Sequence, residues 1–238
     1  AEQQGHAAVL EMLRAAVVAR LQAGVAVDQP AAAVAVGAGA ATARALCDAG
    51  RAGDVAEMAR LLDAGAEPDT LVAVHTPSGT VVQCTALIEA AGRDQLDAVR
   101  LLLDRGADVN AVEAFRGQTA LMWAAAQKQP NMIAELIRDG ADVDARSMVN
   151  AWARQVTGEP RAIHRPAGGL TPLLYASREG CIECTRNLIA GGADIDLADP
   201  EGVTPLIMAI TNMRFDLASY LLDAGANPNN WDWWGRTP

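Results

Sequence analysis

Positive charge and aromatic side chains are scarce in this chain of 238 residues. Lys and Arg number 19 against 29 Asp and Glu, which gives a formal net charge of −10, and Phe, Trp and Tyr together make up only 4%. Binding along a nucleic-acid backbone requires clustered Lys and Arg, so this balance argues against a general nucleic-acid-binding protein. The apolar segment 31–42 is short and interrupted by Gly. We therefore expect no membrane insertion.

The sequence motifs of common enzyme classes are also missing. There is no Gly-x-Ser-x-Gly, no phosphate loop of the Gly-x-x-x-x-Gly-Lys type and no His-Glu-x-x-His. The three histidines, His6, His75 and His164, lie far apart in the sequence. We expect no catalytic residue, no metal ion and no cofactor within these residues.

The chain has only four cysteines, at positions 47, 84, 181 and 184. The spacing of Cys181 and Cys184 occurs in metal sites and in redox pairs, but no second pair lies nearby in the sequence. We expect Cys181 and Cys184 to be two core or near-core thiols instead of such a site. Cys47 and Cys84 are expected to be structural.

What the chain does have is an internal repeat. Variants of Leu-Leu-x-x-Gly-Ala-Asp begin at residues 61, 102, 136, 188 and 221. The last four follow a Thr-Pro-Leu or Thr-Ala-Leu opening. The openings begin at Thr85, Thr119, Thr171, Thr204 and Thr237, with separations of 34, 52, 33 and 33 residues. Such a period predicts a stacked array of units, and arrays of this kind usually bind partners and rarely catalyse reactions.

Each unit reads as helix, tight turn, helix and long projecting loop. The Thr can cap the first helix, and Pro in the next position needs no amide donor there. Met132, Ile133, Leu136 and Ile137 have the spacing of one buried helical stripe. Left-handed glycines are expected to end the second helices, namely Gly106, Gly140, Gly192 and Gly225.

The unit of 33 residues, Thr-Pro-Leu and Gly-Ala-Asp-Val-Asn resemble the ankyrin repeat over about residues 44–238, and the best single match is 171–196. The resemblance implies an all-α ankyrin-repeat solenoid of helix-turn-helix units with projecting β-hairpin-like loops. A looser likeness to bacterial exported ankyrin proteins with a long insertion, and a first residue other than Met, slightly favour export over a cytoplasmic location.

We expect residues 1–42 to form a degenerate repeat or N-terminal helical cap, and residues 43–238 to form the array, with about five repeats and the start of another. Segment 69–84 is expected to be a hairpin insertion, and 146–168 a long basic insertion. Because Thr237-Pro238 begins a further opening, we expect the native protein to continue or something to cover this end.

The resemblance also implies that partners dock on the loop tips and first helices. The candidate positions there are Phe115, Arg116, Gln127, Arg178, Glu179, Trp231, Trp233 and Trp234. The insertion adds Trp152, Arg154, Arg161 and Arg165 as candidates. We expect the Trp-rich loop, residues 231–234, to contact a partner, a part of the protein beyond this sequence, or neighbouring residues of the array. The inserted arm either grips an acidic partner or folds back on the protein's own acidic surface, and single-stranded nucleic acid is a remote alternative.

Three functions remain open from the sequence. The first is a non-catalytic module that binds a protein partner. The second is a structural subunit that self-associates or packs into a larger assembly, and the third is an accessory segment of a longer enzyme. The repeat pattern does not identify the partner, because repeat framework residues specify the fold and not what is bound.

Overall fold

The computed structural model describes residues 38–75, 81–149, 168–232 and 235–238. Residues 1–37, which include most of the expected N-terminal cap, lie outside the described residues. So do the tip of the expected hairpin, most of the basic insertion, and Trp233 and Trp234.

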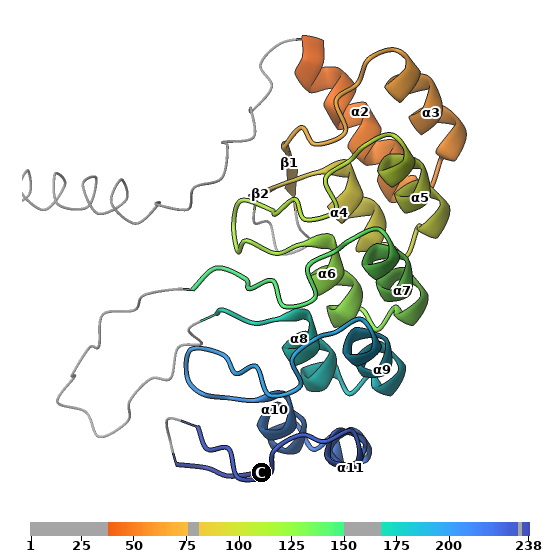
Figure 1. The fold of residues 1–238 in the computed structure, drawn as a ribbon. Helices are drawn as coiled ribbons and strands as arrows, with labels where there is room; N and C mark the ends of the chain where they lie inside the picture. Colours follow the sequence, from red (N-terminus) through yellow and green to blue (C-terminus); the bar gives the residue numbers. More distant parts are fainter. Residues whose placement is uncertain (1–37, 76–80, 150–167, 233–234) are drawn as a thin grey trace, which may run out of the picture. The chain divides into compact units, whose positions relative to one another are not determined.

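Five pairs of helices make up the array over its described residues. In chain order they are α2 (Ala38–Ala52) with α3 (Val55–Asp63), α4 (Ala86–Ala91) with α5 (Leu96–Asp104), α6 (Ala120–Ala126) with α7 (Pro130–Arg138), α8 (Pro172–Glu179) with α9 (Ile182–Ala190), and α10 (Pro205–Thr211) with α11 (Phe215–Asp223). The first helices of the pairs pack on one another in order, and the second helices form a neighbouring layer (Figure 1). The expected all-α solenoid is confirmed.

The openings start the first helices as the sequence predicts. The side chains of Thr85, Thr119, Thr171 and Thr204 each accept a hydrogen bond from the backbone N–H three residues later. Pro172 and Pro205 occupy the first helical positions of α8 and α10. These local contacts fix where each unit begins.

Residues with a left-handed backbone conformation lie at both ends of the second helices. The expected glycines have positive φ, at 84° for Gly106, 87° for Gly140, 95° for Gly192 and 99° for Gly225. The turn between the two helices of a unit also needs a left-handed residue. Three units use a side-chain-bearing residue there, namely Asp94, Lys128 and Met213, with φ of 59°, 60° and 58°. Such residues are strained compared with Gly in the same place.

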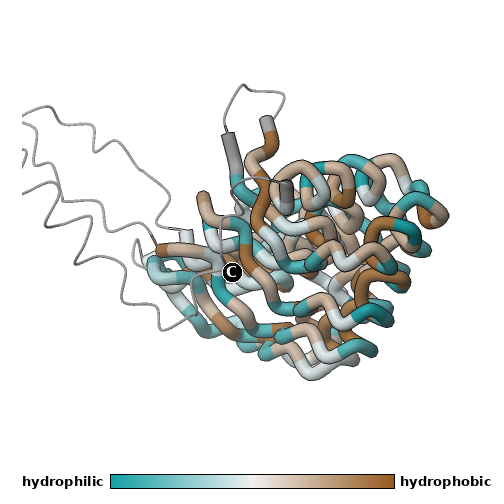
Figure 2. The backbone as a smooth tube through the Cα atoms, turned by 90° about the horizontal axis from the view of Figure 1, so that it is seen from above, coloured by the Kyte–Doolittle hydropathy of each residue, from teal (hydrophilic) through white to brown (hydrophobic). Residues whose placement is uncertain are grey.

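The core lies between the two helix layers. Pairs of small residues such as Ala124-Ala125 are fully buried and let neighbouring first helices approach closely. Leu102, Leu136 and Leu188 of the second helices are also fully buried. Hydrophobic and hydrophilic stretches alternate along the stacked helices (Figure 2), as expected for helices with one buried side.

The segment between the first two units contains the only two strands among the described residues. Strand β1 (Val72–His75) pairs antiparallel with β2 (Val81–Cys84), so that Val72 lies opposite Cys84. The two strands form the stem of a hairpin between the first two units.

A ladder of hydrogen bonds joins the loop of each unit to the next unit. The acceptors are Asp69, Asn110, Asp144 and Asp196, and the donors are the backbone N–H groups of Asp108, Asp142, Asp194 and Asn227, at 3.0, 2.8, 3.1 and 3.0 Å. We call these contacts the loop ladder. Burial raises the pKa of the Asp69 carboxyl. The hydrogen bond between Asp144 and Asp194 joins a side-chain oxygen to a backbone N–H like the other three, although the basic insertion lies between these two residues in the sequence.

Candidate functional site

The loops that precede the first helices are joined side by side. The backbone N–H of Ala114 donates to the carbonyl of Gln83 on β2 at 2.9 Å, and Met148 N–H donates to the Arg116 carbonyl at 2.6 Å. These bonds hold three consecutive loops in one layer. Gly117 has φ of 62°, and a Cβ there would lie 3.2 Å from the Met148 nitrogen, so the close approach requires glycine.

A buried carboxylate fixes the loop that carries two of the predicted binding residues. Glu113, 1% exposed, accepts hydrogen bonds from the backbone N–H groups of Phe115 at 2.7 Å, Arg116 at 2.6 Å and Gln118 at 3.2 Å. Asp199 accepts from two N–H groups in the loop before α10. We did not predict either acid from the sequence. An acidic residue five or six positions before a capping Thr is the pattern that could have indicated both of them.

The root of the inserted arm is a short antiparallel ladder. Ser147 donates its N–H to the Leu170 carbonyl at 3.0 Å, and its hydroxyl accepts the Leu170 N–H at 2.9 Å. Val149 forms an antiparallel bridge with Gly168. The chain thus leaves and re-enters the array at adjacent points.

Arg146, the first arginine of the insertion, anchors this root. Its guanidinium donates to the carbonyls of Gly169 at 3.2 Å and Ala198 at 2.8 Å. Ala198 belongs to the next loop along the array, so the loop layer extends over a fourth unit.

Exposed apolar side chains gather on this layer. Phe115 is 51% exposed, Met148 49% and Val149 52%, and the Arg116 guanidinium lies 5.5 Å from the centre of the Phe115 ring. We call Phe115, Arg116, Met148 and Val149 the finger patch. We had not predicted Met148 and Val149 as binding residues, because only the folded root places them beside Phe115.

The other predicted positions lie elsewhere. Gln127 is exposed at the end of α6, and Arg178 and Glu179 lie at the end of α8. These are the helix ends opposite the loop layer, so the predicted residues fall into two groups. Arg178 pairs with Glu179 at 2.9 Å and lies 5.0 Å from the centre of the Tyr175 ring.

The remaining predicted positions belong to the insertion and to the Trp-rich loop. Trp231 is 73% exposed. The other predicted residues lie outside the described part of the chain, namely Trp152, Arg154, Arg161, Arg165, Trp233 and Trp234.

The cysteines require a correction. Cys181 and Cys184 form a disulfide, so the prediction of two thiols is wrong. Cys181 caps the start of α9 and Cys184 is the third residue of that helix, which brings their sulfur atoms together. Cys47 and Cys84 are free and buried. Burial raises the pKa of the Cys47 thiol to about 12 and that of the Cys84 thiol further still, so both resist ionisation.

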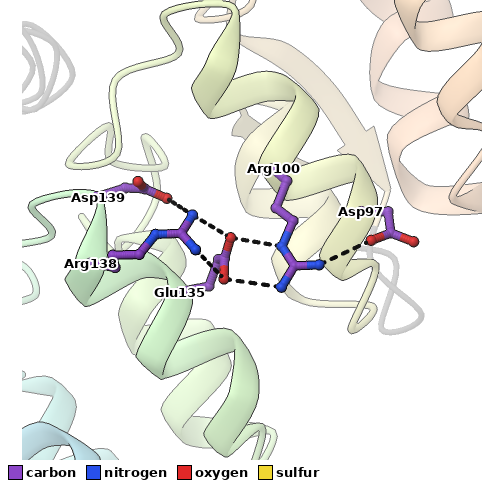
Figure 3. A network of polar contacts seen from close by, with 5 residues as sticks. All are labelled: Asp97, Arg100, Glu135, Arg138 and Asp139. Carbon is purple, nitrogen blue, oxygen red and sulfur yellow. Dashed lines mark hydrogen bonds and ion pairs between the residues drawn. The ribbon is translucent and has the colours of Figure 1, made fainter.

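A network of charged side chains lies on two neighbouring second helices (Figure 3). Glu135, whose side chain is 7% exposed, accepts hydrogen bonds from Arg100 of α5 at 2.8 Å and from Arg138 at 2.6 Å. The Arg100 guanidinium holds the pKa of the Glu135 carboxyl below its usual range. A shifted pKa can mark a catalytic group. Here arginines occupy both carboxylate oxygens, and the contacts join two neighbouring second helices.

The described residues carry neither a metal-binding cluster nor a membrane-spanning helix. They contain no group of three or more His, Cys, Asp or Glu placed to hold a metal ion. None of their helices combines the length and the apolar character needed to cross a membrane.

Comparison with known proteins assigns this chain to a family through a family-model match and several relatives. The family model for ankyrin repeats (3 copies) matches residues 46–147 and 153–232, which is more than half of the chain. An ankyrin repeat and KH domain-containing protein of Caenorhabditis briggsae is 29% identical over 157 residues, covering 61% of this chain and 6% of its own length. The B-cell lymphoma 3 protein homolog of Mus musculus is 33% identical over 134 residues, with coverages of 56% and 25%.

A putative palmitoyltransferase of Danio rerio is 28% identical over 152 residues, with coverages of 64% and 21%. This chain therefore spans a quarter or less of the length of each of these three relatives. The repeat period, the capped helix pairs and the family match agree, and the chain belongs to the ankyrin repeat family.

Proposed function

We propose that this array is a non-catalytic module that binds a protein partner through the finger patch. Ankyrin repeats generally mediate protein–protein interaction. The observation that carries the proposal is that Phe115, Met148 and Val149, each about half exposed, lie on adjoining loops. Contiguous exposed apolar groups of this kind mark interaction sites.

The loops beneath the patch support this proposal because they are held in place before binding. Glu113 fixes one loop with three hydrogen bonds, and the Ser147–Leu170 pair fixes the other. Ordering side chains and loops opposes association, so loops that are already fixed lose less entropy when a partner docks. Phe115 and Arg116 supply aromatic and guanidinium groups of the kind that dominate binding energy at interfaces.

The inserted arm adds a preference for an acidic partner. It leaves the array at Val149, inside the finger patch, and returns at Gly168. Residues 146–168 carry four arginines and one glutamate, a formal +3 in a chain of −10. Opposite charges steer association and favour the matching partner. We propose that Trp152, Arg154, Arg161 and Arg165 contact the same partner, and that Gln127, Arg178 and Glu179 lie at the edge of the contact or outside it.

Affinity capture with mass spectrometry identifies partners, and titration of each purified partner then tests the site. We expect Phe115→Ala to weaken binding roughly tenfold or more, as for a central interface aromatic. Replacing residues 150–167 with a short Gly-Ser linker should weaken it further, and more strongly at low ionic strength. Met213→Ala is the control, since Met213 is 76% exposed in the turn before α11, away from the loop layer. Unchanged affinity in the Phe115 and linker variants would refute this site.

Self-association is a second candidate function, favoured by α11. Phe215 and Leu222 are 65% and 45% exposed. Ile182 and Ile189 hold the corresponding positions of α9 and pack against the hydrophobic cluster of the following unit. The outer side of α11 is therefore apolar and suited to another copy or subunit. Light scattering across concentration tests this, and a mass of 24.8 kDa at every concentration would exclude self-association.

The third candidate, an accessory segment of a longer enzyme, has its support in the palmitoyltransferase relative. That relative is matched over only a small part of its length. In this proposal the array recruits or positions a protein substrate and the chemistry lies in other residues. Activity assays of the complete open reading frame with and without the array would test it.

A further inference from the structure

The disulfide at the start of α9 joins two residues with very different surroundings. Cys184 is fully buried, whereas Cys181 is partly exposed. The other second helices explain the difference. Position 184 corresponds to the buried Ala98, Met132 and Leu217. Position 181 is the cap before the helix, which other units fill with polar residues.

This asymmetry decides which sulfur an external thiol can reach. Thiol–disulfide exchange needs a thiolate to attack one sulfur while the other leaves. Cys184 is 0% exposed, whereas Cys181 is only partly buried, since it packs against the core cluster and keeps some contact with solvent. The accessible atom is therefore Cys181 Sγ, and Cys184 is the leaving and resolving group.

The start of α9 offers a hydrogen-bond donor to the Cys181 sulfur. That sulfur accepts a hydrogen bond from the Cys184 N–H at 3.2 Å, one of the amide groups that the first turn of α9 leaves without a helical acceptor. A thiolate at this position is favoured by the helix dipole. The remaining thiols of the chain, Cys47 and Cys84, are enclosed in the core and serve as internal controls.

A cationic side chain lies beside this pair. The Arg214 side chain packs over Gly180, where an added Cβ would lie 2.6 Å from Arg214 Cδ, and Gly180 has φ of 77°. Arg214 Nε donates to the Arg178 carbonyl at 3.3 Å. The nearest acids along the chain are already matched, since Glu179 pairs with Arg178 and Glu183 pairs with Arg186.

We propose that Cys181–Cys184 is a thiol–disulfide exchange site for an anionic low-molecular-weight thiol of the glutathione type. The incoming thiolate attacks Cys181 Sγ and forms a new S–S bond with it. The Cys181–Cys184 bond breaks, and Cys184 leaves with the electron pair and takes up a proton. A second thiol then attacks the mixed disulfide. Two thiols are oxidised to their disulfide, and the protein pair gains two electrons and two protons. Arg214 attracts the carboxylates of the incoming thiol.

The first test uses the full chain equilibrated in mixtures of reduced and oxidised glutathione. Free thiols are trapped by acid and alkylation and counted by intact mass, and helix content is followed by circular dichroism. We expect the pair to pass between oxidised and reduced forms while the helix signal stays constant and Cys47 and Cys84 stay unmodified by glutathione. Reduction that occurs only when the helix signal is lost would overturn the proposal.

Single-cysteine variants test which sulfur reacts. Cys184→Ala should form a glutathione adduct at Cys181 with oxidised glutathione, and Ala98 at the same helix position of α5 shows that alanine fits there. In Cys181→Ala, the glutathione adduct at Cys184 should form at least about tenfold more slowly, because a buried thiol is inert. Equal rates for the two variants, or no adduct at Cys181, would contradict the assignment.

Arg214→Gln tests the role of charge, since Gln95 and Gln129 hold the same position in other units. It should slow reduction of the disulfide by reduced glutathione but not by the neutral thiol 2-mercaptoethanol. Equal slowing with both reagents would remove the role given to Arg214.

Discussion

Replacing Glu135 by Gln should separate the contribution of its charge from that of its shape. The carboxylate of α7 accepts four hydrogen bonds, two from Arg100 of α5 and two from Arg138. A Gln side chain has the same length but only one acceptor oxygen, and its amide N–H₂ would face guanidinium donors. The contact between two second helices should therefore weaken while their packing stays the same.

The expected loss follows from the exposure of the partners. A fully buried pair that loses one member costs about 3–5 kcal/mol. Here Glu135 is 7% exposed, but Arg100 and Arg138 are 46% and 62% exposed and regain contact with water. We expect the free energy of unfolding to fall by about 1–2 kcal/mol, as for lost hydrogen bonds to a charged group. That corresponds to a decrease in Tm of roughly 2–8 °C for a chain of this size.

The stability difference between wild type and Glu135→Gln should become smaller as the pH falls. The folded-state pKa of Glu135 lies below its unfolded value, so the stabilisation is complete above the ordinary glutamate pKa of about 4.3 and is lost as pH falls through the lower folded value. Thermal unfolding followed by circular dichroism at pH 7 and at acidic pH should show a gap between wild type and variant that closes in acid.

Glu57→Gln is the matched control for this prediction. Glu57 also makes two close hydrogen bonds to an arginine, Arg60, at 2.7 and 2.6 Å, but both residues belong to α3 and their side chains are exposed. Its Tm should change by no more than ~1 °C, as for surface ion pairs. Equal Tm values for Glu135→Gln and wild type at pH 7, or an undiminished gap in acid, would refute the reasoning.

Three further predictions concern the loops and turns. Met213→Gly should stabilise the protein by about 0.5–1 kcal/mol in denaturant unfolding, because Met213 has φ of 58° and is 76% exposed, so strain is relieved and little packing is lost. Thr204→Ala should cost about 1 kcal/mol in the same assay, and Thr204→Ser much less, because Ser keeps the cap of α10. The stability of Asp199→Asn relative to wild type should increase as the pH rises from 3 to 7, since burial raises the pKa of Asp199 and ionisation of its carboxyl opposes folding. A relative stability that decreases over this range would contradict this.

The local rules of the repeat could be predicted from the sequence. Thr119 and Thr204 cap helices and Gly106 ends one because these contacts involve only a few neighbouring residues. The left-handed Lys128 carries no such signal, because the turn conformation there is imposed by packing of the two helices and not by the residue type.

The site could be predicted only in part. Phe115 is exposed on its loop, but the position of Met148 beside it depends on the hydrogen bond between Met148 and Arg116, which are 32 residues apart in the sequence. The Cys181–Cys184 spacing is common to metal sites, disulfides and helix-core thiols, so the spacing alone does not distinguish them. Export, a bacterial origin and the domain boundaries stay predictions.

The loop ladder has a consequence for how recognition can change in this protein. Asp144 accepts a hydrogen bond from the Asp194 amide directly, and Ser147 and Leu170 close the base of the arm, so residues on either side of the arm make contacts that set the register of these two units. Closure entropy rises only slowly with loop length. A foreign peptide of different length can therefore be grafted at this position, and natural variation can rewrite it, without any compensating change in the helices.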